Sequence, residues 1–135
     1  MNKLSLNLSS SIEWLNAGKI LIHPTESIWG IGCDAFNDHA VEQVFILKKR
    51  DLSKSFILLA ESLESLEKYI KVIRKDDQKF LSKHWPGAYT FLIKYNNKLP
   101  QHLRNDSGKI AVRVSDHLPL KSLIEGFSGF MISTS

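Results

Sequence analysis

Short apolar runs alternate with segments of helical periodicity along most of the 135-residue chain. Strands are expected at 20–22, 55–60, 88–95, 110–114 and 129–132, where β-branched and aromatic residues are bounded by turn-forming ones. Helices are expected from a capping box at Ser10 to Gly18, from Asn37 or Asp38 to Arg50, from Ser62 to Ile70, over 76–84, and from Ser115 or Asp116 to Gly126. This interleaving predicts a single α/β or α+β domain around a mixed sheet.

The stretch KILIHPTESIWGIGCD, residues 19–34, holds the first candidate chemistry. Its apolar start predicts a buried strand that ends at Pro24, because proline lacks the backbone donor of a strand ladder. The polar residues 25–27 follow at once, at the end of a strand, where open α/β sheets bind ligands. Gly30 and Gly32 would let the backbone approach a ligand closely. A capped turn between two buried segments explains the same residues equally well.

Arg113 is the most informative single residue outside that stretch. It lies between Val112 and Val114 in an apolar strand, and a cation left buried and unpaired there would cost several kcal/mol. Arg113 must therefore reach solvent or find an anion. Thr90, in another expected strand, could face a ligand, although threonine is also a common strand residue.

Hydroxyls and cations are the remaining candidates for binding chemistry. The hydroxyls follow apolar strands, at Thr25, Ser27, Ser133 and Ser135, and the cations are Lys48, Arg50, Lys54 and Arg113. Together they suit a phosphate and a carboxylate, since arginine gives bidentate geometry and lysine a point charge. Unrelated surface charges remain the alternative.

The composition and the motifs of the chain exclude several classes of site. The formal charge of +4 favours anionic partners, and the single cysteine, Cys33, excludes an internal disulfide and suggests a reducing compartment. The five histidines lack metal-ligand spacing, so no metal ligand is assigned, and Walker A, GxGxxG and nucleophile-elbow motifs are absent. No apolar run approaches the roughly 18 residues of a membrane span, and a cytoplasmic location is expected.

Five sequence motifs occur in a fixed order over nearly the whole chain. They are PTESIWGIGCD at 24–34, LKKR at 47–50 followed by Lys54, WPGAYTF at 85–91, AVRVSDH at 111–117 and ISTS at 132–135. In this order they resemble the motifs of the YrdC-like family of threonylcarbamoyl-AMP synthases. The resemblance implies one domain with a twisted, mixed, open sheet flanked by helices.

The resemblance also implies a nucleotidyltransferase activity. Members of the family join L-threonine, bicarbonate and ATP into threonylcarbamoyl-adenylate, with Mg²⁺ bound mainly through the ATP phosphates. The product serves the t6A transferase machinery, which modifies adenosine 37 of tRNA. A non-catalytic module that binds double-stranded RNA or tRNA is the alternative. A piece of a hydrogenase-maturation carbamoyltransferase is disfavoured, because no zinc-finger cysteines precede the motifs.

Site residues follow from the resemblance, motif by motif. L-Threonine would be held by Thr25, Arg113 and Ser133, with Arg113 on its carboxylate. ATP would be bound by Lys48, Arg50, Lys54 and Ser135, with Lys48 and Arg50 supplying electrostatic support to the reaction. No general base is assigned.

The sequence departs from the family pattern in a few places. The family usually continues Ser-Thr-Ser with Ala-Asn and several dozen further residues, so residues 1–135 are expected to be a YrdC-like domain that lacks its C-terminal part. Ala88 replaces the second proline of a Pro-Gly-Pro motif, Asp51 replaces a frequent proline, and Trp29 stands where Tyr or Phe is common.

Overall fold

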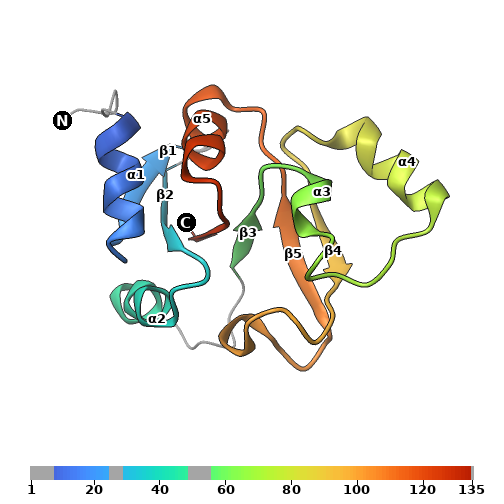
Figure 1. The fold of residues 1–135 in the computed structure, drawn as a ribbon, viewed down its shortest axis with the longest axis horizontal. Coiled ribbons are helices and arrows are strands. Elements are labelled where there is room, and N and C mark those ends of the chain that lie inside the picture. Colours follow the sequence, from blue (N-terminus) through green and yellow to red (C-terminus); the bar gives the residue numbers. More distant parts are fainter. Residues whose placement is uncertain (1–7, 25–28, 49–55, 135) are drawn as a thin grey trace.

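The fold is built on one mixed sheet. The computed structural model describes residues 8–24, 29–48 and 56–134. Within them the strands are β1 (Leu21–Pro24), β2 (Trp29–Asp34), β3 (Ile57–Leu59), β4 (Thr90–Lys94), β5 (Lys109–Arg113) and β6 (Met131–Thr134). They lie in the order β1-β2-β6-β3-β5-β4, with β3 and β5 parallel and the other neighbours antiparallel (Figure 1). The predicted mixed sheet is confirmed.

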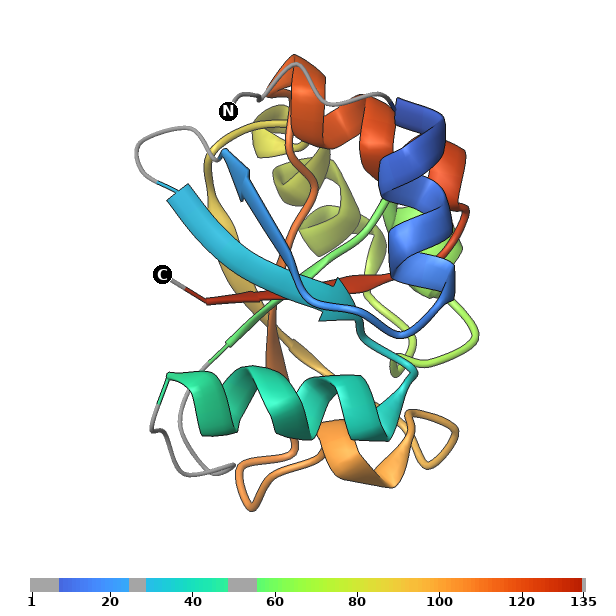
Figure 2. The same cartoon turned by 90° about the vertical axis from the view of Figure 1, so that its left-hand side faces the viewer.

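Helices cover the two faces of this sheet unequally. They are α1 (Leu8–Asn16), α2 (Asp38–Leu47), α3 (Leu63–Leu66), α4 (Lys75–His84) and α5 (Leu118–Phe127), with a 3₁₀ turn, η1, at Gln101–Leu103. Helices α1 and α5 lie together on one side of the sheet and α2 lies on the other (Figure 2). Four helices, α1, α2, α4 and α5, match their predicted ranges within a few residues.

Strand alternation assigns the core residues to two faces. We call the face that carries the buried side chains of Cys33, Leu58, Val112 and Ile132 the closed face. The opposite face, which carries Leu59, Met131, Ser133 and Arg113, is the open face. Helices α1 and α5 cover the open face at Leu59 and Met131, through a second apolar cluster.

Two predicted helix caps are confirmed. Asn37 caps α2, because its side-chain oxygen accepts the backbone N–H of Ala40 at 2.9 Å. Ser62 caps α3, and Ser62 and Ser65 each accept the other's backbone N–H. However, α3 ends at Leu66 and not at Ile70, because Ile70 forms a bridge with Tyr95 instead.

Two other predicted caps are wrong. Ser10 lies inside α1, which includes residues from Leu8 onward. Neither Ser115 nor Asp116 caps α5, since His117 precedes the helix and makes no side-chain cap bond. The hydroxyl of Ser115 instead accepts the backbone N–H of His117 at 3.1 Å, so it closes a turn between β5 and α5.

The stretch 19–34 forms an antiparallel pair of strands. The first, β1, is an edge strand, and Ile22 is 58% exposed; the prediction of a buried strand is therefore wrong for that residue. The pattern does not predict β2, because Gly30 and Gly32 interrupt its apolar alternation and glycine is a poor strand former. Pairing of Gly32 with Leu21 on one side and Ser133 on the other gives β2 its extended form.

Candidate substrate site

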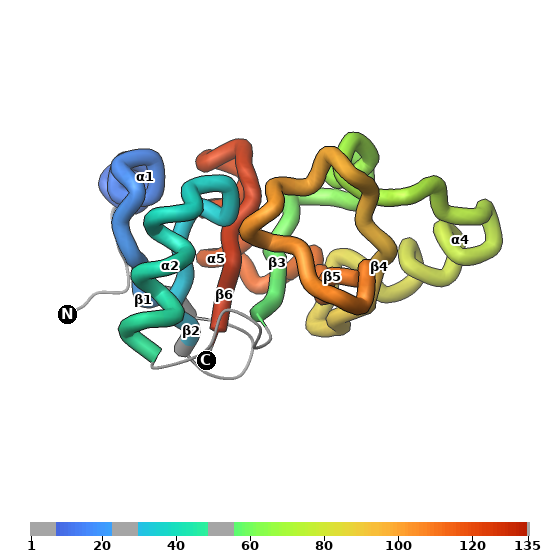
Figure 3. Tube along the Cα trace, turned by 90° about the horizontal axis from the view of Figure 1, so that it is seen from below, coloured from blue at the N-terminus to red at the C-terminus, as the bar shows by residue number. Residues whose placement is uncertain are grey.

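The end of β6 and the end of α2 lie on the same side of the molecule. Strand β6 runs antiparallel to β2 and β3, so Ser133 pairs with Ile57 and Thr134 pairs with Ile31, near the starts of those strands. Helix α2 follows the end of β2 and returns along the closed face to Lys48. Figure 3 shows the ends of α2 and β6 on one side of the molecule. The fold thus places a hydroxyl-bearing strand end beside a lysine-bearing helix end.

Ser133 and Thr134 are both buried, although they point to opposite faces. Ser133 is 7% exposed and belongs to the open face, in register with Ile57 and Gly32. Thr134 is 6% exposed and belongs to the closed face. Of the two hydroxyls, that of Ser133 therefore shares a face with Arg113.

Arg113 lies at the end of β5 on the open face. Arg113 pairs in register with Leu59 on β3, and Leu59 pairs in register with Met131 on β6. Ser133 lies two residues further along β6. Two strand spacings and two residue steps put the Cα atoms of Arg113 and Ser133 roughly 12 Å apart. A long arginine side chain and a small bound molecule can span such a distance.

The guanidinium of Arg113 is held by the neighbouring strand. Its Nε donates a hydrogen bond to Thr90 Oγ1 at 2.9 Å, and Thr90 lies directly opposite Arg113 in the β4–β5 register. Arg113 is half-buried while Thr90 is exposed. Arg113 thus points along the open face, as expected of a cation that must avoid the apolar core.

On the open face, strand β2 has glycines beside Ser133. Gly32 pairs with Ser133, and Gly30, two residues earlier, belongs to the same face. Both glycines are buried. Without Cβ atoms on β2, the open face has no side chain between Leu21 of β1 and Ser133 of β6 along that register.

The predicted site residues divide into two groups. The structure describes Lys48, Arg113 and Ser133, whereas Thr25, Arg50, Lys54 and Ser135 lie outside the described residues. Lys48 is half-buried at the end of α2, and its backbone N–H bonds to Val44 O at 3.0 Å. Thr90 adds a contact that the sequence alone does not predict, because it depends on the pairing of β4 with β5.

Burial shifts the pKa of two neighbouring groups at the end of β2. Desolvation, with a further contribution from the charge of Asp34, raises the pKa of the Cys33 thiol to about 12. Cys33 is also fully buried, so it packs in the core and does not present a reactive thiolate. Desolvation also raises the pKa of Asp34, opposed by the backbone N–H of Phe36 and by the nearby His102. His102 Nε2 lies 2.7 Å from Ala35 O.

In residues 8–24, 29–48 and 56–134 no three His, Cys, Asp or Glu side chains gather in a way that could hold a metal ion. None of the helices in these ranges is long and apolar enough to cross a membrane.

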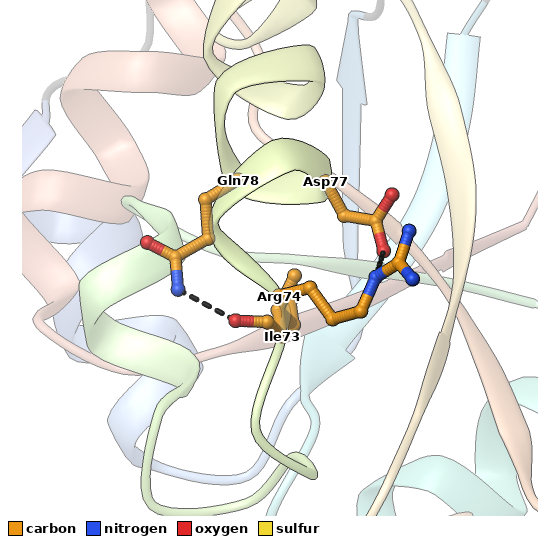
Figure 4. A network of polar contacts seen from close by, with 4 residues as sticks. All are labelled: Ile73, Arg74, Asp77 and Gln78. Atoms are coloured by element: carbon orange, nitrogen blue, oxygen red, sulfur yellow. Dashed lines mark hydrogen bonds and ion pairs between the residues drawn. The ribbon is translucent and has the colours of Figure 1, made fainter.

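A cavity of about 980 Å³ lies between α3, α4 and α5. Acidic side chains from 61–67 and basic side chains from 71–79 line it, with Trp85 and Val114 among the apolar lining. At its α4 wall, Gln78 Nε2 donates to Ile73 O at 2.8 Å (Figure 4). At the start of the same helix, Arg74 Nε lies 3.5 Å from Asp77 Oδ2. Of the predicted site residues that the structure describes, Lys48, Arg113 and Ser133, none lines this cavity, so we do not assign the predicted chemistry to it.

Comparison with known proteins gives matches over most of the chain. The Sua5/YciO/YrdC family model, described as "Telomere recombination", matches residues 13–135. The threonylcarbamoyl-AMP synthase of Saccharophagus degradans is 40% identical over 128 residues, which are 95% of this chain and 67% of the relative.

Solved structures agree with the observed architecture. Sua5 of P. abyssi, in a crystal structure with L-threonine, aligns with a TM-score of 0.86 and 26% identity over 95% of this chain and 38% of Sua5. YciO of E. coli aligns with a TM-score of 0.82 and 24% identity over 95% of this chain and 62% of YciO, which supports the fold.

Proposed function

The chain belongs to the Sua5/YciO/YrdC family, and we propose from this membership that it acts in threonylcarbamoyl-AMP synthesis. The proposed substrates are L-threonine, bicarbonate and ATP, and the products are threonylcarbamoyl-adenylate and pyrophosphate. The adenylate would then pass to the t6A transferase machinery, which modifies adenosine 37 of tRNA. An enzyme with these partners would work in the cytoplasm.

The reaction needs positioning more than covalent help from the protein. The threonine amine adds to the carbon of CO₂, formed from bicarbonate by loss of hydroxide, and the amine loses a proton to give a carbamate. A carbamate oxygen then bonds to the α-phosphorus while the bond from phosphorus to the bridging oxygen breaks and pyrophosphate leaves. The protein must align two anions and neutralise their charge. Mg²⁺ would be carried by the ATP phosphates, as in other phosphoryl-transfer enzymes.

The single observation that carries the threonine assignment is the placement of Arg113. Its guanidinium lies along the open face, fixed by Thr90 and on the same face as the buried hydroxyl of Ser133. Arginine is the residue that best recognises a carboxylate, through two parallel N–H donors. Arg113 therefore holds the threonine carboxylate in this proposal, and Ser133 and Thr25 contact the rest of the amino acid.

ATP binding is assigned to the side of the molecule where α2 and β6 end. Lys48 caps α2 there, and Arg50 and Lys54 follow it closely in sequence. Together they would surround the triphosphate, and Lys48 and Arg50 would offset charge that develops at the α-phosphate. Ser135, the residue after β6, would contact the nucleotide.

Formation of a labelled adenylate tests this proposal. The chain is incubated with ATP, Mg²⁺, bicarbonate and ¹⁴C-L-threonine, and the products are separated by chromatography. We expect a labelled adenylate that depends on both ATP and bicarbonate, together with release of pyrophosphate. Absence of product and of threonine binding, while an active relative forms the adenylate in the same buffer, would contradict the proposal.

A second candidate function rests on the charge of the open face. Lys94 and Lys109 lie directly opposite each other in the β4–β5 register, on the face that also carries Arg113, and both lysines are exposed. Like charges in such a pair repel each other unless an anion lies between them. This favours a module that binds double-stranded RNA or tRNA.

The two candidates differ in their dependence on salt. RNA binding through phosphate contacts weakens steeply as salt rises. If RNA binds in that way while ATP and L-threonine do not bind, the RNA-binding function is favoured. Binding of both small substrates without RNA favours the synthase.

A further inference from the structure

Thr90 is placed to set the orientation of the Arg113 guanidinium. Thr90 and Arg113 face each other across neighbouring strands, and Nε of Arg113 donates to Oγ1 of Thr90 at 2.9 Å. We propose that Thr90 is a positioning residue that fixes how Arg113 presents its donors to the threonine carboxylate. This inference rests on the proposed function.

The chemistry of guanidinium gives the contact its consequence. A guanidinium has one donor on Nε and four on its two Nη atoms, and it binds a carboxylate either side-on, through Nε and one Nη, or end-on, through both Nη atoms. The Thr90 hydroxyl occupies Nε, so the side-on mode is lost. Arg113 therefore takes the carboxylate end-on, through the Nη edge that points away from the guanidinium's bond to the chain.

The backbone and rotamer of Thr90 suit this role. Antiparallel pairing with Arg113 fixes the position of its Cα, and a β-branched side chain has few χ1 rotamers. The hydroxyl therefore stays in place at little further loss of entropy. Leu92, the next residue of β4 on the same face, has no polar side-chain atom and is 68% exposed, so it provides a matched control on the same strand.

Two substitutions separate the hydroxyl from the shape of the side chain. Thr90→Val keeps the β-branched form and removes the hydroxyl, and Thr90→Ser keeps the hydroxyl. Affinity for L-threonine is measured by calorimetry, and affinity for L-threoninol, which lacks the carboxylate, by competition. Thermal unfolding of each variant checks the fold, and Leu92→Ala reports the effect of a change nearby on the same face.

We expect Thr90→Val to weaken L-threonine binding roughly three- to ten-fold, the range of one net hydrogen bond. Binding of L-threoninol and the KM for ATP should stay unchanged, Thr90→Ser should restore L-threonine binding, and Leu92→Ala should bind as the parent chain does. The Nε–H signal of Arg113 in a ¹⁵N spectrum should shift in Thr90→Val alone.

Two outcomes would overturn the inference, and they differ from failure of the proposed function. If the parent chain binds L-threonine and Thr90→Val binds it equally well, Thr90 does not position Arg113. The same holds if Thr90→Val weakens L-threonine and L-threoninol to the same extent. If the parent chain binds no L-threonine at all, the proposed function is overturned, and the role of Thr90 falls with it.

Discussion

The two faces of the sheet differ in how completely they are buried. On the closed face Cys33, Leu58, Val112 and Ile132 are each at most 1% exposed, in one continuous apolar cluster. On the open face α1 and α5 cover one half, while Thr90 and Leu92 of β4 remain exposed. The two described residues assigned to L-threonine binding, Arg113 and Ser133, lie on the open face.

This difference divides two tasks between adjacent residues of the same strand. Val112 packs in the core while Arg113 points along the open face, and Ile132 and Ser133 repeat the arrangement on β6. Strand alternation thus lets one strand stabilise the fold and present binding groups at once. We expect changes on the closed face to alter mainly stability and changes on the open face to alter mainly binding.

Thiol labelling of Cys33 should give the largest contrast. Cys33 is the single cysteine of the chain and is fully buried on the closed face, with a pKa raised to about 12. Because a thiol reacts as its thiolate and needs access, we expect labelling by an aromatic disulfide at pH 8 to be roughly a thousand-fold slower in the native chain than in denaturant. Absorbance of the released thiol measures both rates. Equal rates would mean that the closed face admits solvent.

The same substitution on each face tests the division of tasks directly. Leu58 on the closed face is 1% exposed, and Leu92 on the open face is 68% exposed. Leu58→Ala should reduce the free energy of unfolding by about 2–5 kcal/mol through lost contacts and a cavity, whereas Leu92→Ala should change it by less than about 0.5 kcal/mol. Urea unfolding followed by circular dichroism measures both. Similar losses in the two variants would contradict the comparison.

Arg113→Lys should separate binding from stability on the open face. Lysine keeps the charge but lacks the flat pair of donors, and it cannot donate to Thr90 as Nε does. We expect the affinity for L-threonine to fall by about 1.5–3 kcal/mol, roughly 10- to 150-fold, with little change in the unfolding midpoint. Calorimetry measures the affinity for L-threonine, and thermal unfolding measures the unfolding midpoint. Unchanged threonine affinity would remove Arg113 from the binding site.

Local signals in the sequence predict several parts of the fold well. Asn37 and Ser62 identify the starts of α2 and α3, because a capping side chain bonds to backbone only a few residues away. The length of α3 and the existence of β2 cannot be predicted from local sequence in the same way. Ile70 leaves the helical pattern to pair with Tyr95, and Gly32 becomes a strand residue through pairing with Ser133. Both depend on partners distant in sequence.

In the candidate site too, contacts between residues distant in sequence could not be predicted. Arg113 can be singled out from sequence, since a cation between two valines needs an explanation wherever it lies. Its contact with Thr90 cannot, because the register of β4 on β5 brings together residues 23 positions apart. The assignments of Thr25, Arg50, Lys54 and Ser135 still rest on the motifs and remain predictions.

Asp34, at the end of β2, should give the smallest effect and the sharpest dependence on pH. Desolvation raises its pKa in the folded chain above the ordinary value of 3.8, so folding favours the protonated carboxyl. The stabilisation is present below pH 3.8 and is lost as the pH rises through the folded pKa. Asp34→Asn keeps an oxygen that can accept the N–H of Phe36, now at 3.0 Å from Asp34 Oδ1, but carries no charge.

We therefore expect Asp34→Asn to unfold at a slightly higher temperature than the parent chain at pH 7, and the difference to shrink as the pH falls toward 3.8. Thermal unfolding midpoints of both proteins, taken at several pH values between pH 3.5 and about pH 7, measure this difference. The charge of His102 favours ionised Asp34, so His102→Gln serves as the control for that contribution. A difference that grows toward acid would show that Asp34 is stabilised as the anion.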